Sequence, residues 1–258
     1  MISILNIDTL IDKNHNHYSS FLIEPLENGQ AITLGNSLRR TLLSNITCFS
    51  TTAIKINNIC NEFVSIHGIK EDLVDILSNI KQIVYKKKKN NFNFLNLLGY
   101  FYLKGPILVS SGILKLPKNT LQIINPMQHI CTLTSNLELF LELRIEKKKN
   151  TKFQTTEKIK SDLLLNNISN ILLIENTFFA IKKINYKVRI IFDNFGLLKE
   201  SLFLEIITNG SILPKRAIQN SLKFLLNLFY PLINHKLLKK LSYKIKKKIL
   251  SRLKLNIK

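Results

Sequence analysis

Four side chains of types that bind metal ions occur in the middle of the sequence: Cys60, His67, His129 and Cys131. Structural zinc sites draw their ligands from short pairs such as Cys-x-x-Cys. No such spacing occurs here, and the remaining cysteine, Cys48, is equally isolated. We therefore expect these residues in strand cores or loops, with reduced thiols, and we predict neither a metal site nor a disulfide framework.

Four carboxylates are candidates for acid–base chemistry: Glu24, Glu27, Asp72 and Asp75. Asp72 and Asp75 have the spacing of one helix face and suit the positive end of a helix, so we interpret them as its solvated side. The sequence shows no glycine-rich phosphate loop and no Ser-His-Asp arrangement. It therefore predicts no catalytic residue, no cofactor and no enzyme in this chain alone.

A strand, a turn and a helix are predicted around the stretch FLIEPLENGQAITLGNSLRRTLLSN, which begins at Phe21. The strand covers residues 19–24, Asn28-Gly29 forms the turn, and Thr33 is the expected N-cap of the helix. Apolar residues recur every four positions and form the buried face of this helix: Leu34, Leu38, Leu42 and Ile46. The opposite face is then available to a partner.

Two adjacent arginines, Arg39 and Arg40, lie on this helix. Arg40 is almost opposite the buried stripe, with Asn36 and Leu43 beside it. A face that is merely solvated favours several charges and no leucine, so we interpret this one as a contact surface. The guanidinium of Arg40 is suited to fork onto a carboxylate or carbonyl of another protein. Arg39 lies nearer the core stripe and is expected to act within the domain or its dimer.

The rest of the chain mixes strands with helices. A hairpin is predicted over residues 51–65 and a helix over 71–85, whose buried stripe is flanked by Lys81. Further strands are predicted at 92–103, 107–116, 121–124, 129–134, 137–145, 182–192 and 201–208. A polar stretch at 146–162 divides the chain into two parts.

The last predicted helix opens at Pro214 and has a wide apolar face. Its members are Ile218, Leu222, Leu225, Leu226, Phe229 and Leu232. A face of this width indicates packing on more than one side, which favours an oligomer. Beyond it, residues 236–258 place leucines and isoleucines at near-helical spacing among lysines, so we expect a basic amphipathic tail.

Size and charge restrict the possible classes of protein. The chain has 258 residues, 45% of them hydrophobic, and a net charge of +21. It can bury a core of its own, and its charge suits a polyanion or an acidic protein partner. Heavy use of Asn, Lys and Ile indicates an AT-rich gene, which also inflates the lysine count. The longest apolar run, 222–233, is too short to span a bilayer, so no membrane partner is expected.

Five stretches, in order along the chain, resemble the alpha-subunit family of bacterial-type DNA-directed RNA polymerases. The first is the stretch that begins at Phe21, which is similar to the pattern EPLExGxxxTLGNxLRRxLLS. The other four are SIHGIKEDLVDILSNIKQI, INPMQHICTLT, INYKVRIIFDN and LEIITNGSILPKRAI. Several ordered matches identify the chain as a member of this family.

The resemblance implies an α+β fold in two parts. Residues 1–47 and 174–235 are expected to form a discontinuous dimerisation domain, a sheet with two helices. Residues 48–173 are expected to form an inserted, mostly-β domain. The family's helical carboxy-terminal DNA-binding domain is not expected here, because too few residues follow the last helix.

The resemblance also implies roles for particular residues. The chain is expected to be a non-catalytic subunit of a nucleotidyltransferase complex, which dimerises and scaffolds assembly of the beta and beta-prime subunits for transcription. Arg40, Leu43 and Asn36 are assigned to beta, and Lys81 and Ile181 to beta-prime. The expected homodimer interface contains Leu38, Leu42, Leu222, Leu225 and Phe229. DNA is expected to be reached only indirectly, through the assembled polymerase.

Two alternatives stay open on the sequence. An AT-biased gene for a protein without a signal peptide suggests an organelle, most simply a plastid (chloroplast), with a bacterial cytoplasm as the alternative. A different class of function is a basic RNA- or DNA-binding protein, which would interleave lysines with stacking aromatics on one surface. The tail contains Tyr243, but the chain has no tryptophan and its lysines are spread over several runs.

Overall fold

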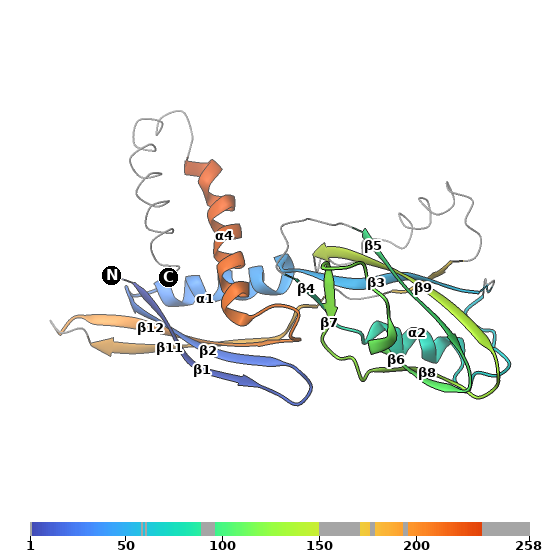
Figure 1. Cartoon of the computed structure of the whole chain (residues 1–258). Helices are drawn as coiled ribbons and strands as arrows, with labels where there is room; N and C mark the ends of the chain where they lie inside the picture. The colour runs from blue at the N-terminus through green and yellow to red at the C-terminus, as the bar shows by residue number, and fades with distance from the viewer. Residues whose placement is uncertain are drawn as a thin grey trace.

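The computed structural model describes residues 2–57, 59, 61–88, 96–149, 171–175, 179–192 and 196–233. Two lobes lie side by side, each built on a β-sheet (Figure 1). Strands predominate, and the described residues contain three α-helices. The α+β class predicted from the sequence is confirmed.

The first lobe contains a four-stranded antiparallel sheet in the order β1-β2-β12-β11. Its strands are β1 (Ser3–Ile11), β2 (His17–Leu26), β12 (Leu198–Thr208) and β11 (Ile181–Phe192). Alternate residues of β12 point to the helix-covered face and are fully buried: Leu202, Leu204 and Ile206. Because β2 pairs with β12, this sheet joins segments that are far apart in the sequence.

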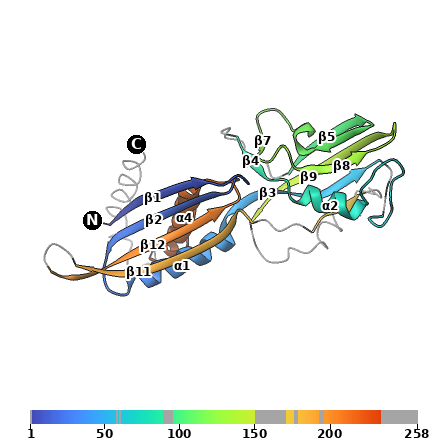
Figure 2. The same ribbon diagram turned by 90° about the horizontal axis from the view of Figure 1, so that it is seen from below.

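Two helices lie on one face of that sheet. Helix α1 (Gln30–Asn45) runs along the sheet, whereas α4 (Pro214–Ile233) rises away from it (Figure 1). The view from below shows the sheet in front of both helices (Figure 2). Pro214 suits the first helical position, where its missing N–H leaves no hydrogen bond unmade. The core under the helices draws its buried residues from 21–48 and 180–218.

The second lobe has a core of its own, drawn from residues 54–174. Its main sheet has the order β10-β3-β9-β5, with two-stranded pairs β4-β7 and β6-β8 and the helix α2 beside it. The strands are β3 (Thr47–Ile56), β4 (Tyr85–Lys87), β5 (Asn96–Lys104), β6 (Ile107–Ser110), β7 (Leu121–Ile123), β8 (His129–Leu133), β9 (Glu138–Lys149) and β10 (Leu172–Leu173), and the helices are α2 (Leu73–Lys81) and the short 3-10 helix η1 (Ser111–Ile113).

The domain boundaries at 47/48 and 173/174 stay predictions. Two boundary residues pack in the opposite lobe from the one that these boundaries assign. Cys48 lies in the first core and Ile174 in the second. Only Ile46 separates α1 from β3, so the chain passes from one lobe to the other without a linker. A second contact joins the lobes where the Lys149 ammonium at the end of β9 lies 5.4 Å from the ring centroid of Phe224 on α4.

Three local predictions were wrong. Helix α1 begins at Gln30 with Gly29 as its N-cap, so Thr33 is not the cap. The expected hairpin at 51–65 is one strand, β3, followed by a loop, because β3 finds its partners in β9 and β10. The helix expected over 71–85 is shorter, since Tyr85 already pairs with Ile123 of β7.

The sequence reading also missed β1. All nine residues of this edge strand are exposed, so it lacks the alternation of buried and exposed positions that marks a strand. The predicted amphipathic tail at 236–258 and most of the polar stretch at 146–162 lie outside the described residues. No helix in the described part of the chain is long and apolar enough to cross a membrane.

Candidate functional site

The outer face of α1 presents the residues assigned to a partner. Asn36, Arg40 and Leu43 are exposed, whereas Leu38 and Leu42 are fully buried beneath them. The wheel prediction therefore holds for Leu38, Leu42 and Arg40, whereas Leu34 is only half-buried and Ile46 lies just after the end of the helix. Arg39, expected nearer the core, is exposed as well.

Close packing on β11 fixes the position of α1. The ring of Tyr186 lies against Gly35, where an added Cβ would come within 2.7 Å of Tyr186 Cδ2. The Tyr186 hydroxyl donates a hydrogen bond of 2.7 Å to Asn36 Oδ1. Gly35 is therefore needed for close approach, and Asn36 is oriented from below before any partner arrives.

A distant carboxylate holds the start of α1. Glu200 on β12 accepts hydrogen bonds from the backbone N–H groups of Gly29, at 2.9 Å, and Ala31, at 3.0 Å. These groups have no partner within the helix, and a negative charge suits the positive end of the helix dipole. Sequence reasoning missed Glu200 because it lies 171 residues from Gly29.

The residues predicted at the dimer interface fall into two groups. Leu38 and Leu42 are buried in the chain's own core, so they support the helix layer but offer no exposed area. Leu222 and Leu225 are half-buried against that core, and Phe229 is 52% exposed. Leu226 and Leu228 are also exposed on α4. The apolar face of α4 is therefore only partly covered by the chain itself.

Lys81 and Ile181, assigned to a second partner, line one open groove between the two lobes. The groove has a volume of about 1000 Å³, and Leu43 lies on its border. Ile181 is only 4% exposed, whereas Lys81 is exposed at the end of α2. The structure thus brings three residues to one surface: Leu43 from the exposed face of α1, Lys81 and Ile181.

One wall of the groove belongs to the first lobe and the other to the second. The first wall contains the turn between β1 and β2 at residues 13–16, the start of β11, and Asn209 after β12. The second wall contains Lys81 at the end of α2, the next three residues, and the loop at 124–128. The start of β3, residues 48–50, lies between them. No single stretch of the sequence contains this site.

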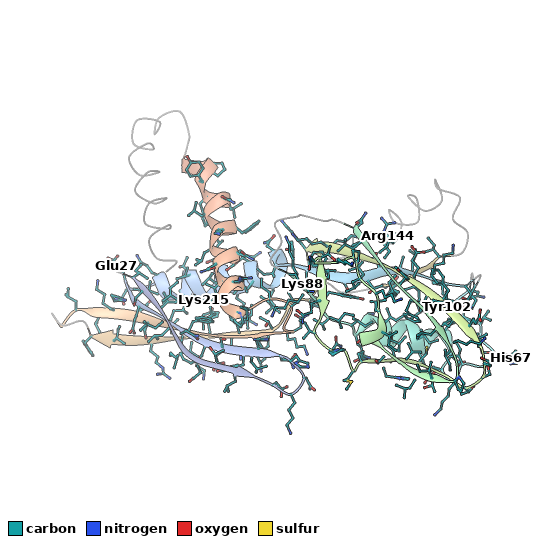
Figure 3. The ribbon with its side chains drawn as sticks, viewed as in Figure 1. Glu27, His67, Lys88, Tyr102, Arg144 and Lys215 are labelled. Atoms are coloured by element: carbon teal, nitrogen blue, oxygen red, sulfur yellow. The ribbon has the colours of Figure 1, made fainter. Side chains whose placement is uncertain are left out.

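The described metal-ligand candidates are placed separately. Burial raises the pKa of the Cys48 thiol and that of the Cys131 thiol to about 12, so both stay protonated. Cys60 lies outside the described residues, and His67 is exposed at the outer end of the second lobe (Figure 3). Within the described ranges, no three Cys, His, Asp or Glu side chains gather as metal ligands.

Glu71 holds α2 to β8. Its Oε1 is 2.9 Å from His129 Nε2, its Oε2 accepts a 2.6 Å hydrogen bond from Thr132 N–H, and the Thr132 hydroxyl donates to Oε1. Burial alone would raise the pKa of Glu71, but these hydrogen bonds to the ionised form outweigh it and lower that pKa. His129 therefore has a structural partner in a carboxylate.

Comparison with known proteins points to one family. The family model for the RNA polymerase Rpb3/RpoA insert domain matches residues 54–175. The DNA-directed RNA polymerase subunit alpha of Rhodomonas salina is 37% identical over 226 residues, which are 88% of this chain and 68% of that protein. That of Cyanidium caldarium is 37% identical over 232 residues, 90% of this chain and 71% of the relative. That of Trichormus variabilis is 32% identical over 226 residues, with coverages of 88% and 69%.

Proposed function

Because the chain belongs to the alpha-subunit family of DNA-directed RNA polymerase, we propose that it forms a two-fold homodimer that holds the beta and beta-prime subunits. As a family member it is a non-catalytic subunit of a nucleotidyltransferase complex and acts in polymerase assembly. The dimer proposal rests on one observation: apolar side chains on the helix side of the first lobe are left exposed.

The two helices do not cover that side. Cross-strand partners share a sheet face, so Val188, paired with the buried Leu202, and Ile4, paired with the buried Ile23, point toward the helices. Both Val188 and Ile4 are nevertheless exposed. Uncovered apolar side chains on the helices and on the strands beneath them include Ile4, Val188, Leu226, Leu228 and Phe229. A second copy, related by a two-fold axis, offers the same apolar surface in return.

The proposed dimer surface is centred on α4. Leu222, Leu225 and Phe229 supply its contact area together with Leu226, while Leu38 and Leu42 lie behind it and hold the layer in place. The proposed dimerisation domain comprises residues 1–47 and 174–235, and the inserted domain comprises 48–173.

The large subunits are assigned to two surfaces. Arg40, Leu43 and Asn36 contact beta, because the exposed α1 face combines a fixed amide, a guanidinium and an apolar side chain. Lys81 and the segment around Ile181 contact beta-prime. The relatives come from algae and from cyanobacteria, and with the AT-rich composition this supports a plastid (chloroplast) location, encoded in that organelle.

Light scattering on the purified chain tests the dimer. We expect the parent to be a dimer at micromolar concentration, without nucleic acid. The double variant Leu226→Glu, Phe229→Glu should be monomeric, because two charges would have to be buried at the interface. Leu225→Glu should also give monomers, although that side chain touches the chain's own core as well.

Leu108→Glu is the matched control, since Leu108 is an exposed apolar residue of β6 in the other lobe. It should remain dimeric. A double variant that stays dimeric while retaining its helix content would exclude α4 from the interface. Co-purification of beta and beta-prime with the parent dimer tests the assembly role, and their absence would contradict it.

A further inference from the structure

The face of the first lobe's sheet that lies opposite the helices, called here the free face, carries rows of apolar side chains (Figure 2). Phe21 and Ile23 on β2 are buried under the helices, so Leu22 between them points to the free face. Cross-strand partners share a face, and Leu22 pairs with Leu5 of β1 and with Phe203 of β12. Leu5 is 51% exposed. One row of apolar side chains therefore crosses three strands.

A second apolar row runs beside the first. Tyr18 of β2 pairs with Leu10 of β1, which is 64% exposed, and with Ile207 of β12. An antiparallel sheet with one solvated face normally has polar side chains on that face. Two apolar rows on the free face therefore indicate a docking surface.

Carboxylates lie between the two rows. Asp8 of β1 and Glu205 of β12 both pair with Ser20 of β2, and the Ser20 hydroxyl donates a hydrogen bond of 3.3 Å to Asp8 Oδ2. Burial raises the pKa of the neighbouring Tyr18 hydroxyl, and the negative charges of Glu205 and Asp8 raise it further. The centre of the free face is thus negative, in a chain whose net charge is +21.

The two edges of the sheet differ. Strand β11 has exposed cations at Lys183, Lys187 and Arg189, and the Arg189 guanidinium lies 5.9 Å from the ring centroid of Phe203. Exposed cations commonly protect edge strands against pairing with another chain. Strand β1 lacks this protection, since its nine residues contain neither lysine nor arginine. The β1 side of the free face is therefore both open and acidic.

One segment of this chain has the complementary chemistry. Residues 236–258 lie outside the described residues and contain ten lysines and arginines and no Asp or Glu. Their apolar residues recur at near-helical spacing: Leu237, Leu238, Leu241, Ile245, Ile249 and Leu253. A basic amphipathic helix of this kind can lay its apolar stripe on the two rows and place lysines beside Asp8 and Glu205.

The length of α4 indicates which copy of the chain this segment reaches. Helix α4 has 20 residues, so it is about 30 Å long, and it rises away from its own sheet (Figure 1). In the proposed dimer two helix layers separate the two sheets, and packed layers lie about 10 Å apart. The end of α4 at Ile233 therefore lies near the sheet of the second copy and far from the free face of its own.

The segment is also long enough to cross that sheet. As a helix, residues 236–258 would measure about 35 Å. Three strands, spaced about 4.8 Å apart, are narrower than that.

We propose that residues 236–258 of one copy pass the β1 edge of the second copy and pack on its free face, with apolar side chains on Leu5 and Leu10 and lysines beside Asp8 and Glu205. The inference rests on the proposed dimer and names a second contact between its two copies. Because the dimer is two-fold symmetric, each copy gives this segment and receives one.

The test is a photo-crosslinking side chain, p-benzoylphenylalanine, in place of Leu10 in the full-length chain. We expect irradiation to join it to residues 236–258 of the other copy. The product should then have the mass of two chains under denaturing conditions, and mass spectrometry should find the new bond within that segment. The matched control is the same side chain in place of Leu98, which is 55% exposed on β5 of the other lobe. It should form no bond to the segment.

Charge variants that also carry the crosslinker test the acidic contact. Asp8→Lys with Glu205→Lys should lower the crosslink yield about tenfold or more, because cations would then face cations. Raising the salt from 0.05 to 0.5 M should lower the yield of the parent. The control Glu62→Lys with Glu175→Lys makes the same charge change at exposed positions of the second lobe and should crosslink as the parent does.

A variant of the segment itself tests the apolar contact. Leu241→Ser with Ile245→Ser leaves the sheet unchanged, so its result does not depend on whether the sheet tolerates two new lysines. It should lower the crosslink yield several-fold, while light scattering still finds a dimer.

The outcomes separate this inference from the proposed dimer. A dimer in which the crosslinker at position 10 never reaches residues 236–258 would overturn the docking and leave the dimer intact. A bond formed within one chain would overturn the exchange between copies. A parent that is monomeric in light scattering would overturn the proposed dimer, and the exchange with it.

Discussion

The two lobes differ in how much of their apolar surface they cover by themselves. The second lobe encloses its core with two layers, and Glu71 ties its helix to β8. The first lobe leaves apolar side chains exposed on β1, β11 and α4, although its helices lie on the same side. The proposed dimer would make the first lobe the incomplete one, finished by a second molecule, and the second lobe the more self-contained one, although it too exposes apolar side chains such as Leu108.

The largest effect is expected at Arg40 in the incomplete lobe. Arg40→Ala removes one partner of a proposed interfacial charge contact, which costs on the order of 2–5 kcal/mol of binding. We expect beta to be lost from co-purification while the fold and the dimer are kept. Arg40→Lys should rescue only in part, since an ammonium cannot form the planar fork.

Arg39→Ala is the neighbouring control and should retain beta. If Arg40→Ala captures beta as well as the parent does, or breaks the dimer first, the assignment of the α1 face is wrong.

Gly35 should show how strictly the first lobe's helix is placed. Gly35→Ala puts a methyl group 2.7 Å from the Tyr186 ring, so the helix or the ring must move, at a cost of about 1–3 kcal/mol of stability. Asn36 would lose its alignment, and beta capture should weaken together with the midpoint of thermal unfolding.

Gly29→Ala makes a useful contrast, since no atom lies within 4 Å of that added Cβ and only its positive φ is strained. If Gly35→Ala changed neither beta capture nor the midpoint of thermal unfolding, the packing of α1 on Tyr186 would not restrict the position of the helix.

Glu71 tests the self-contained lobe. Glu71→Gln removes the charge and misaligns one of its hydrogen bonds, so we expect a loss of about 1–2 kcal/mol in unfolding free energy, with dimerisation and beta capture retained. Because the folded state lowers the pKa of Glu71, the ionised carboxylate contributes stability above the pKa of the unfolded state, about 4.3.

That contribution should be lost as the pH falls through the still lower folded pKa. Thermal unfolding of parent and variant from pH 7 to pH 3 should therefore converge at the acid end. If the stability difference between parent and variant stayed the same from pH 7 to pH 3, ionisation of Glu71 would not be the source of that difference.

The smallest effect is expected at Glu200. Glu200→Gln keeps the shape of the side chain but weakens the hold on the start of α1, which should cost about 0.5–1.5 kcal/mol. Amide hydrogen exchange should speed up at Gly29 and Ala31 while the second lobe stays protected. Uniform acceleration over both lobes would show a global loss of stability in place of a local one.

The sequence predicts what depends on neighbouring residues. The four-residue spacing of Leu34, Leu38 and Leu42 places the buried face of α1 correctly, and hence the exposure of Arg40. The start of α1 could not be found in this way, because Glu200 comes from a distant strand and displaces the expected cap at Thr33.

The groove shows the same limit for the site. Its lysines come from a turn, a helix end and a strand start that only the folded chain brings together. A charge count cannot identify them among 38 lysines and arginines. Strand β1 was missed by the sequence prediction for another reason. Both of its faces are exposed, so its sequence has no alternation of apolar and polar residues that would indicate a strand.

The junction between α1 and β3 determines where this gene tolerates insertions and deletions. Cys48 packs into the first core and Ile54 into the second, and the pairing of β3 with β9 shifts register between Thr51 and Ala53. One residue added or deleted after Ile46 would move Cys48 away from the first core or, if carried past that shift, turn Ile54 and Ile56 to the opposite face, away from the second core. Length variants should therefore be eliminated by selection at this junction, even when each inserted residue is one that a β-strand accepts.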